Sequence, residues 1–387
     1  MSKQIYIFNP EHDLCIANGD ENFVPPRSAL GFAKDNVDLS EYLKRPNKQL
    51  RQIIPWGWNH ALKKRLINEG IDPAALPSET ELQFIRTHSR REFALDVQSR
   101  LNCSESHVIG PDYRIVARSV SEIDTFLSDN GSAVLKSPLS GSGKGIRFVR
   151  ERLSESDKGW CRRTLDKQGA VIVEQRLEII KECAMLFECH HEGIDFIGYS
   201  LFESKNGAYS RNILASNEDI EEIIARYISL DTLTDVRESL QSILSDTLVG
   251  HYEGFLGVDQ MICQPVSPIF VPVSEINLRM TMGLIARNAF CFQCQMLHNY
   301  NEEACKNEVC KNCQERNGEE RTSETISEGD EDDAGTNFSS CEHTNAKGKD
   351  IGKKTVRCVS PRLSIESIRI CRRPCRSAMQ SIIRLWI

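Results

Sequence analysis

The five residues EINLR, at positions 275–279, constrain this chain more than any other stretch. They complete an apolar run whose Val and Ile residues predict a buried strand over 269–276. Side chains two positions apart on a strand point to the same face, so Glu275, Asn277 and Arg279 are expected to project together. Oxygen ligands beside a fixed cation suit a magnesium–polyphosphate site. The alternative is a strand whose polar face simply meets solvent.

The residues before this motif predict a neighbouring strand that carries a second carboxylate. The run GFLGVDQMIC, at residues 254–263, is apolar up to the point where it presents Asp259. If it is the partner of the strand at 269–276, it brings Asp259 to the oxygen ligands of the motif. Asp259 is therefore a further candidate ligand for Mg²⁺.

A loop rich in glycine and serine lies farther upstream, in the segment VLKSPLSGSGKGIRF at residues 134–148. Glycines let backbone N–H groups approach phosphate oxygens, because no Cβ stands in the way. The flanking runs at 133–138 and 145–149 predict two strands joined by this loop. The candidate phosphate contacts are Ser140, Gly141, Ser142, Gly143, Lys144 and Gly145, with Lys136 on the entering strand.

Three other nucleotide-binding loops do not fit this segment. A P-loop needs a glycine six residues before its lysine and a Ser or Thr after it, but Pro138 and Gly145 stand there. A dinucleotide fingerprint needs a helix after the loop, whereas IRFVRE continues as a strand. A kinase loop places its lysine on a later strand, whereas Lys136 precedes this loop. A β-hairpin flap over phosphates remains.

The N-terminal part alternates strands and helices. Short apolar runs at 4–8 and 50–56, each followed by a helical pattern, suggest a small parallel α/β unit over residues 1–105. Ligands of such sheets bind beyond the carboxyl ends of the strands. Polar residues at those ends can also serve turns and helix caps, which is the alternative explanation. The candidate substrate contacts at the strand ends are His12, Asp13 and Asn59.

Composition places the chain among ordinary soluble proteins. Its 387 residues are 40% hydrophobic and carry a net charge of −7, and a negative net charge does not favour binding to nucleic acid. The first apolar run is too short for a signal peptide, and no run reaches the roughly 18 apolar residues of a membrane span. These features predict a cytoplasmic protein with neither a nucleic-acid nor a membrane partner.

The chain is expected to be disordered beyond about residue 300. Residues 319–333 are acidic, with Ser, Thr and Gly and almost no large apolar groups, so burial cannot offset the entropy lost on ordering. Residues 344–387 then become basic, and such segregation is typical of a solvated or partner-binding tail. A charged, mostly disordered tail is therefore predicted for 301–387.

Cysteines are concentrated near and within this tail. Cys291 and Cys294, together with Cys310 and Cys313, have the spacing of a four-thiolate Zn²⁺ site. The alternative is that the first pair faces the core from a helix and the second lies reduced in the tail. The sequence leaves both interpretations open.

The order of these elements resembles the ATP-grasp superfamily over about residues 85–290. A hairpin flap, a lysine on its entering strand and the later Asp–Glu–Asn–Arg set carry the resemblance. It implies an ATP-grasp domain over 106–300, preceded by the small parallel domain at 1–105, so that the fold class is α/β and α+β. The run VIVEQRLEIIKE, at residues 171–182, resembles the hinge strand of that family.

The resemblance also implies roles for individual residues. The implied ATP contacts are Lys136 at the α- and β-phosphates, Glu174 at the adenine amino group, the backbone of Gln175 and Leu177 at the ring, and Glu182 at the ribose. The implied magnesium ligands are Asp259, Glu275 and Asn277. Many members carry a second phosphate-contacting lysine before the loop. This chain has Arg90 and Arg91 instead, and the sequence leaves open which of them makes that contact.

Members of the superfamily mostly join a carboxylate to an amine through an acylphosphate, using ATP and Mg²⁺, with Mn²⁺ as a substitute. By this resemblance the partners are small-molecule carboxylate and amine substrates, and Lys136 and Arg279 are the catalytic residues. Arg279 would clamp the acceptor carboxylate. The alternatives are an ATP-grasp kinase or phosphotransferase, and a non-catalytic ATP-binding regulatory protein. Similar enzymes are commonly dimeric, so a homodimer is compatible with the resemblance.

Overall fold

The computed structural model describes residues 5–30, 53–103, 105–141, 145–205, 208–264, 266–292 and 294. Strands and helices alternate near the N-terminus, and hairpins with interleaved helices follow, as the sequence predicts. The tail expected at 301–387 lies outside them, as does the zinc half-site at Cys310 and Cys313. Within the described part of the chain, no helix is long and apolar enough to cross a membrane.

Two short strands near the N-terminus pair in parallel, β1 (Ile5–Ile7) with β2 (Ile53–Pro55). Helix α1 (His12–Asn18) follows the first strand, and α3 (His60–Asn68) follows the second. This arrangement is the small parallel α/β unit that the sequence predicts. The chain then continues through η2 (Pro73–Ala75), α4 (Glu79–His88), α5 (Arg91–Ser99) and η3 (Pro111–Tyr113).

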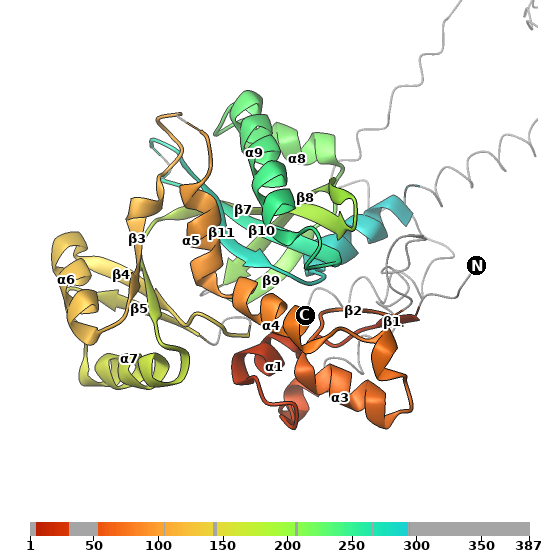
Figure 1. Cartoon of the computed structure of the whole chain (residues 1–387). Helices are drawn as coiled ribbons and strands as arrows, with labels where there is room; N and C mark the ends of the chain where they lie inside the picture. The colour runs from red at the N-terminus through yellow and green to blue at the C-terminus, as the bar shows by residue number, and fades with distance from the viewer. Residues whose placement is uncertain are drawn as a thin grey trace, which may run out of the picture. The chain divides into compact units, whose positions relative to one another are not determined.

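Four antiparallel strands form the first of two larger sheets, in the order β3-β6-β4-β5. They are β3 (Arg114–Ala117), β4 (Ser132–Lys136), β5 (Ile146–Arg150) and β6 (Val171–Gln175). Helices α6 (Val120–Asn130) and α7 (Glu155–Gln168) pack together on one face and share a hydrophobic core with the sheet (Figure 1). Strands β4 and β5 are the predicted hairpin, with Lys136 opposite Ile146 where the glycine loop begins and ends.

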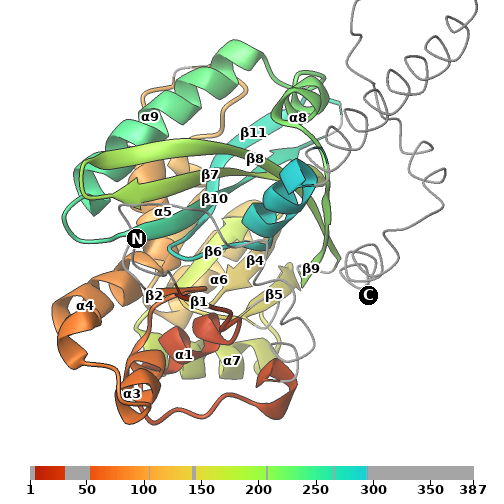
Figure 2. The same ribbon diagram turned by 90° about the vertical axis from the view of Figure 1, so that its right-hand side faces the viewer.

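Five antiparallel strands form the second sheet, in the order β11-β10-β7-β8-β9. They are β7 (Ile179–His190), β8 (Gly193–Lys205), β9 (Ala208–Ile213), β10 (Gly254–Cys263) and β11 (Ile269–Asn277). Helices α8 (Asn217–Ile224) and α9 (Leu230–Leu248) pack on β8, and α5 packs on β11 (Figure 2). Strand β10 has the predicted bounds, and β11 extends one residue past its predicted end.

The hinge segment departs from the sequence interpretation. Residues 171–182 do not form one strand: β6 ends at Gln175 in the smaller sheet, and β7 begins at Ile179 in the larger. Leu177, in the connection, is partly buried and packs against Tyr113 of η3, Cys263 of β10 and Val271 of β11. Glu182 consequently lies on the larger sheet.

A buried arginine joins the two sheets. Arg114, on β3, donates to the backbone oxygens of Val273 and Ser274 on β11, at 2.8 and 3.1 Å. It also donates to Oε1 of Gln98 at 2.6 Å and lies 3.6 Å from a carboxylate oxygen of Glu174. A buried guanidinium is stable only when it is paired. These contacts therefore fix β11, and the motif it carries, against the smaller sheet.

Candidate functional site

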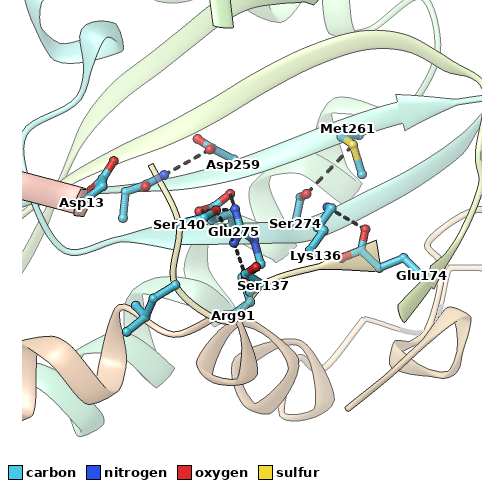
Figure 3. Close-up of polar contacts among 12 residues, drawn as sticks. Asp13, Arg91, Lys136, Ser137, Ser140, Glu174, Asp259, Met261, Ser274 and Glu275 are labelled. Atoms are coloured by element: carbon cyan, nitrogen blue, oxygen red, sulfur yellow. Dashed lines mark hydrogen bonds and ion pairs between the residues drawn. The ribbon is translucent and has the colours of Figure 1, made fainter. Parts of the chain in front are cut away.

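Two carboxylates face each other across β10 and β11. Asp259 and Glu275 are direct partners in the antiparallel register, and Nδ2 of Asn277 donates to Oδ2 of Asp259 at 3.1 Å (Figure 3). Burial, followed by the charge of Glu275, raises the pKa of Asp259 to about 7. The structure thus brings together the three residues that the sequence resemblance assigned to a metal.

The chemistry of this donor set suits a hard divalent cation. Mg²⁺ is held in proteins by one or two carboxylates and other oxygen ligands, and this cluster offers two carboxylates and an amide oxygen. Burial, and then the charge of Glu275, raises the pKa of Asp259, and a bound dication would offset the negative charge of the pair. Among the described residues, no group of three or more His, Cys, Asp or Glu side chains is placed so that it could hold a metal ion. Asn277 would therefore be the third ligand.

The structure distinguishes the two arginines that the sequence left open. Arg91 has a buried side chain whose Nη2 donates to both oxygens of Glu275, at 3.1 Å each, while Nη1 donates to Oγ of Ser140 at 3.1 Å. Arg90 instead pairs with Glu92 at 2.6 Å, away from this cluster. Arg91 is therefore the arginine that faces the site. It links the motif strand to the base of the glycine loop.

Lys136 meets Glu174 at the other end of the cluster. Nζ of Lys136 lies 2.6 Å from Oε2 of Glu174, so the carboxylate that the resemblance placed at adenine contacts the lysine here (Figure 3). Burial alone would raise the pKa of Glu174, but the charges of Lys136, Arg114 and Arg91 together lower it. Glu174 is thus an ionised, buried carboxylate that orients Lys136.

The glycine loop is described only at its two ends. Ser142, Gly143 and Lys144 lie outside the described residues. At Gly145 an added Cβ would lie 2.3 Å from Cβ of Ser140, so only glycine fits there. The N–H of Ser137 donates to the carbonyl oxygen of Gly145 at 2.8 Å and closes the base of the loop. Gly141 lies against Leu14 of α1, which brings the N-terminal helix to the loop.

The remaining predicted ATP contacts form hydrogen bonds or packing contacts within the protein. Nε2 of Gln175 donates to Asn130 at 2.6 Å. Glu182 accepts from the backbone N–H of Ser204 at 2.7 Å, and burial raises the pKa of its carboxyl group. The side chain of Leu177 packs inward, which leaves its backbone as the group that could meet a ring.

Arg279 is held by a residue of the N-terminal helix. Its Nε and Nη2 lie 2.6 and 2.9 Å from the two oxygens of Asp13, and Nη1 donates to the carbonyl oxygen of Met280 at 3.0 Å. Arg279 also lies over the ring of Trp56, 5.9 Å from its centroid. Arg279, which the resemblance assigns to the acceptor carboxylate, therefore already binds a carboxylate of the chain itself.

His12 and Asn59 lie in contact with each other inside the N-terminal unit. Both are buried, and Nδ2 of Asn59 approaches Nδ1 of His12 at 3.2 Å. Oδ1 of Asn59 accepts from the N–H of Leu62 and caps α3, as the cap alternative predicted. His12 packs against Gly57, where an added Cβ would lie 2.5 Å from Nδ1. His12 and Asp13 both line the cleft beside Glu275 and Arg279, but His12 is almost fully buried, whereas the side chain of Asp13 is 26% exposed.

No protein-family model and no curated protein sequence matches this chain. Solved structures do resemble it. N5-carboxyaminoimidazole synthetase from Staphylococcus aureus, complexed with ADP, is 15% identical with a TM-score of 0.42, over 73% of this chain and 71% of that chain. D-alanyl-alanine synthetase A from Vibrio cholerae is 11% identical with a TM-score of 0.44, over 76% and 94%. Biotin carboxylase from Campylobacter jejuni is 14% identical with a TM-score of 0.39, over 59% and 49%.

The fold places the residues of the ATP-grasp resemblance on two sheets. One antiparallel sheet carries the hairpin with Lys136, and the other carries Asp259, Glu275 and Asn277. At identities of 11–15% and TM-scores below 0.5, the likeness to these solved structures assigns neither a family nor an activity. What the chain can do is therefore inferred from its own side chains.

No sequence signal pointed to two of the residues that shape the site. Arg114 contacts β11, about 160 positions away, and Gln98 contacts Arg114, and neither belongs to a local motif. The pairing of Asp13 with Arg279 joins residues that are 266 positions apart. Such contacts become visible only once the strands are paired.

Only one pair of the candidate zinc ligands lies among the described residues, and it gives no support for the site. Cys291 and Cys294 are both exposed, at the end of the helical segment that begins at residue 282. The alternative that they face the core is therefore wrong for this pair. Their proposed partners, Cys310 and Cys313, lie outside the described residues.

We expect His12 to make stability depend on pH. Burial, the largest cause, lowers its pKa from 6.5 to about 4, so the folded protein keeps the ring neutral where the unfolded chain binds a proton. The stability that this provides is complete above pH 6.5 and is lost as the pH falls toward 4, by about 3 kcal/mol. Urea unfolding at pH 7 and pH 4 should show a larger loss for wild type than for His12→Asn. Substitution of the exposed His191 by Asn should leave the wild-type loss unchanged, and equal losses in wild type and His12→Asn would contradict the prediction.

We expect Lys136→Met to weaken both the fold and nucleotide binding. The change leaves Glu174 buried without its closest cation, which should cost about 3 kcal/mol in the free energy of unfolding. Adding Glu174→Gln removes the stranded charge, so the double variant should recover most of that loss while still failing to bind a fluorescent ATP analogue. A double variant no more stable than Lys136→Met would contradict this account of the pair.

Proposed function

We propose that this chain is an ATP- and Mg²⁺-dependent ligase, which activates a carboxylate as an acylphosphate and joins it to an amine. One observation carries the proposal, the order of charged groups along the site. In Figure 3, Glu275 lies between Lys136 at one end and Asp13, the partner of Arg279, at the other. A phosphate-binding cation, oxygen ligands for a metal and an acceptor-side arginine are what such a reaction needs, in that order.

The nucleotide side is assigned to residues of the two larger sheets. Lys136 and the backbone of the glycine loop would bind phosphate oxygens. Asp259, Glu275 and Asn277 would hold Mg²⁺, which would offset the charge of the β- and γ-phosphates. In phosphoryl transfer the protein mainly positions the reactants and neutralises charge, so no nucleophilic Ser or Cys is required.

The acceptor side is assigned to Arg279 and the N-terminal unit. The guanidinium of Arg279 would stabilise the oxygens of the acceptor carboxylate, and then the oxyanion that forms when the amine attacks. In this proposal residues 1–105 form the substrate-side domain, and residues 106–300 form the ATP-grasp domain. The partners are small molecules, a carboxylate and an amine.

The test is Mg²⁺-dependent release of ADP from the purified chain, with pools of carboxylic acids, amines and amino acids. ADP should appear only when a carboxylate and an amine are both present. Hydroxylamine should replace the amine and yield a hydroxamate, because it attacks an acylphosphate. ADP release with an alcohol or phosphate acceptor, and no hydroxamate, would favour a phosphotransferase. ATP binding without turnover in any pool would favour a regulatory protein.

A further inference from the structure

We propose that Asp13 and Arg279 together form a binding site for an acceptor that carries an ammonium group beside its carboxylate, as an α-amino acid does. This inference rests on the proposed function and names its substrate class. It is more specific than the expectation that Arg279 binds any carboxylate. The reason is that Arg279 already forms an ion pair with Asp13 of the same chain.

The hydrogen-bonding groups of the pair are only partly used. A guanidinium has five N–H donors, and three bonds from Arg279 go to Asp13 and to the carbonyl oxygen of Met280. An ionised carboxylate offers about four acceptor positions, and Arg279 fills two of those on Asp13. Donors for a carboxylate and acceptors for an ammonium group therefore remain side by side.

The pair faces a cleft and not bulk protein. The side chains of Asp13 and Arg279 are 26% and 17% exposed, and they line a cleft that opens to solvent and has a cavity volume of about 20 Å³. Ser89 lines the same cleft, and its Oγ, which is buried, has no hydrogen-bond partner among the described residues. The wall of the cleft thus holds a polar side chain whose hydrogen bonding is incomplete.

The charges of the cleft favour a neutral zwitterion over an anion. Arg91 neutralises Glu275, and Asp13 neutralises Arg279, so these four side chains carry no net charge. An acceptor with only a carboxylate would gain from Arg279 and be repelled by Asp13. An added ammonium group on the acceptor turns that repulsion into attraction.

Anchoring of α1 does not require the pair. The helix is also held by Nε of Arg86, which donates to the carbonyl oxygen of Ile16 at 2.9 Å, and by His12, which packs against Gly57. A partly exposed ion pair adds little further stability. The position of Asp13 is therefore better explained by what the pair presents to the cleft.

The test uses the whole chain with Mg²⁺ and a non-hydrolysable ATP analogue. The twenty common amino acids are screened by calorimetry, and each that binds is compared with the acid that lacks its amine and the amine that lacks its carboxylate. We expect at least one amino acid to bind at least tenfold more tightly than either fragment. This comparison is made on wild type, so it does not depend on a variant that folds.

The variant Asp13→Asn should weaken binding of that amino acid at least tenfold and leave binding of the deaminated acid unchanged or tighter. Asp166→Asn, at an exposed position on α7, is the matched control and should change neither. Binding of the ATP analogue should be the same in all three proteins.

Two results would overturn the inference while the proposed function stands: the analogue binds but no amino acid does, or the deaminated acid binds as tightly as its amino acid. Failure of wild type to bind the analogue would overturn the proposed function, and the inference with it.

Discussion

Glu275→Gln is expected to lower Mg²⁺-dependent ATP turnover at least a hundredfold in a variant that folds but is less stable, because the buried guanidinium of Arg91 loses its carboxylate partner. Glu275 lies directly opposite Asp259 across β10 and β11. The amide of a glutamine in its place would offer no negative charge to a bound dication. Loss of one such electrostatic contact in a transition state costs about 3 kcal/mol or more. Asn277→Ala should have an effect of the same kind, because Asn277 completes the ligand set.

The measurement is ADP release under saturating substrates, with circular dichroism and urea unfolding to confirm that each variant is folded. Glu222→Gln, at an exposed position on α8, is the control and should retain wild-type turnover. Direct binding of Mn²⁺, measured by electron paramagnetic resonance, separates a metal effect from a purely chemical one. Wild-type turnover in both Glu275→Gln and Asn277→Ala would remove the metal assignment.

Arg114→Met is expected to be the most destabilising substitution among those considered, at about 3–5 kcal/mol in the free energy of unfolding. The side chain is fully buried and donates to two backbone oxygens of β11. Its removal strands those acceptors and leaves Glu174 with one cation fewer, which is the situation in which breaking a buried pair is costly.

Urea unfolding at pH 7 checks this value. Arg118→Met is the matched control, because Arg118 lies one residue beyond the end of β3, is exposed, and should change stability by less than about 1 kcal/mol. The double variant Arg114→Met/Glu174→Gln should be more stable than Arg114→Met alone. If Arg114→Met matched the Arg118 control, the guanidinium would not join the two sheets as described.

Strands and the hairpin could be predicted from the sequence because their signals are local. The bounds of β10 follow from one apolar run, and the hairpin of β4 and β5 follows from apolar runs on both sides of a glycine loop. Asp259 and Glu275 could be expected to meet for the same reason, since each lies on a strand that its own neighbours specify.

Side-chain partners across the fold could not be predicted in this way. The choice between Arg90 and Arg91 depends on where α5 begins and on its packing against β11. The turn of the chain at Leu177, from one sheet to the other, depends on an apolar cluster assembled from distant segments. The carboxylate of Asp13 reaches Arg279 because the parallel pair β1–β2 brings α1 to the end of β11, and no run of residues encodes that approach.

The attachment of the N-terminal unit has an evolutionary consequence. The N–H of Met280 donates to the carbonyl oxygen of Trp56 at 2.8 Å, so β2 meets the chain just past β11, beside the arginine. Groups that would recognise the acceptor thus come from the first sixty residues, through Asp13, and from the end of β11, through Arg279, whereas groups that would bind the nucleotide come from later residues alone. Selection could adapt such a chain to a new acceptor by changing α1, while Arg279 and the nucleotide-binding residues are inherited unchanged. Among relatives, we expect the helix after the first strand to vary faster than the EINLR motif.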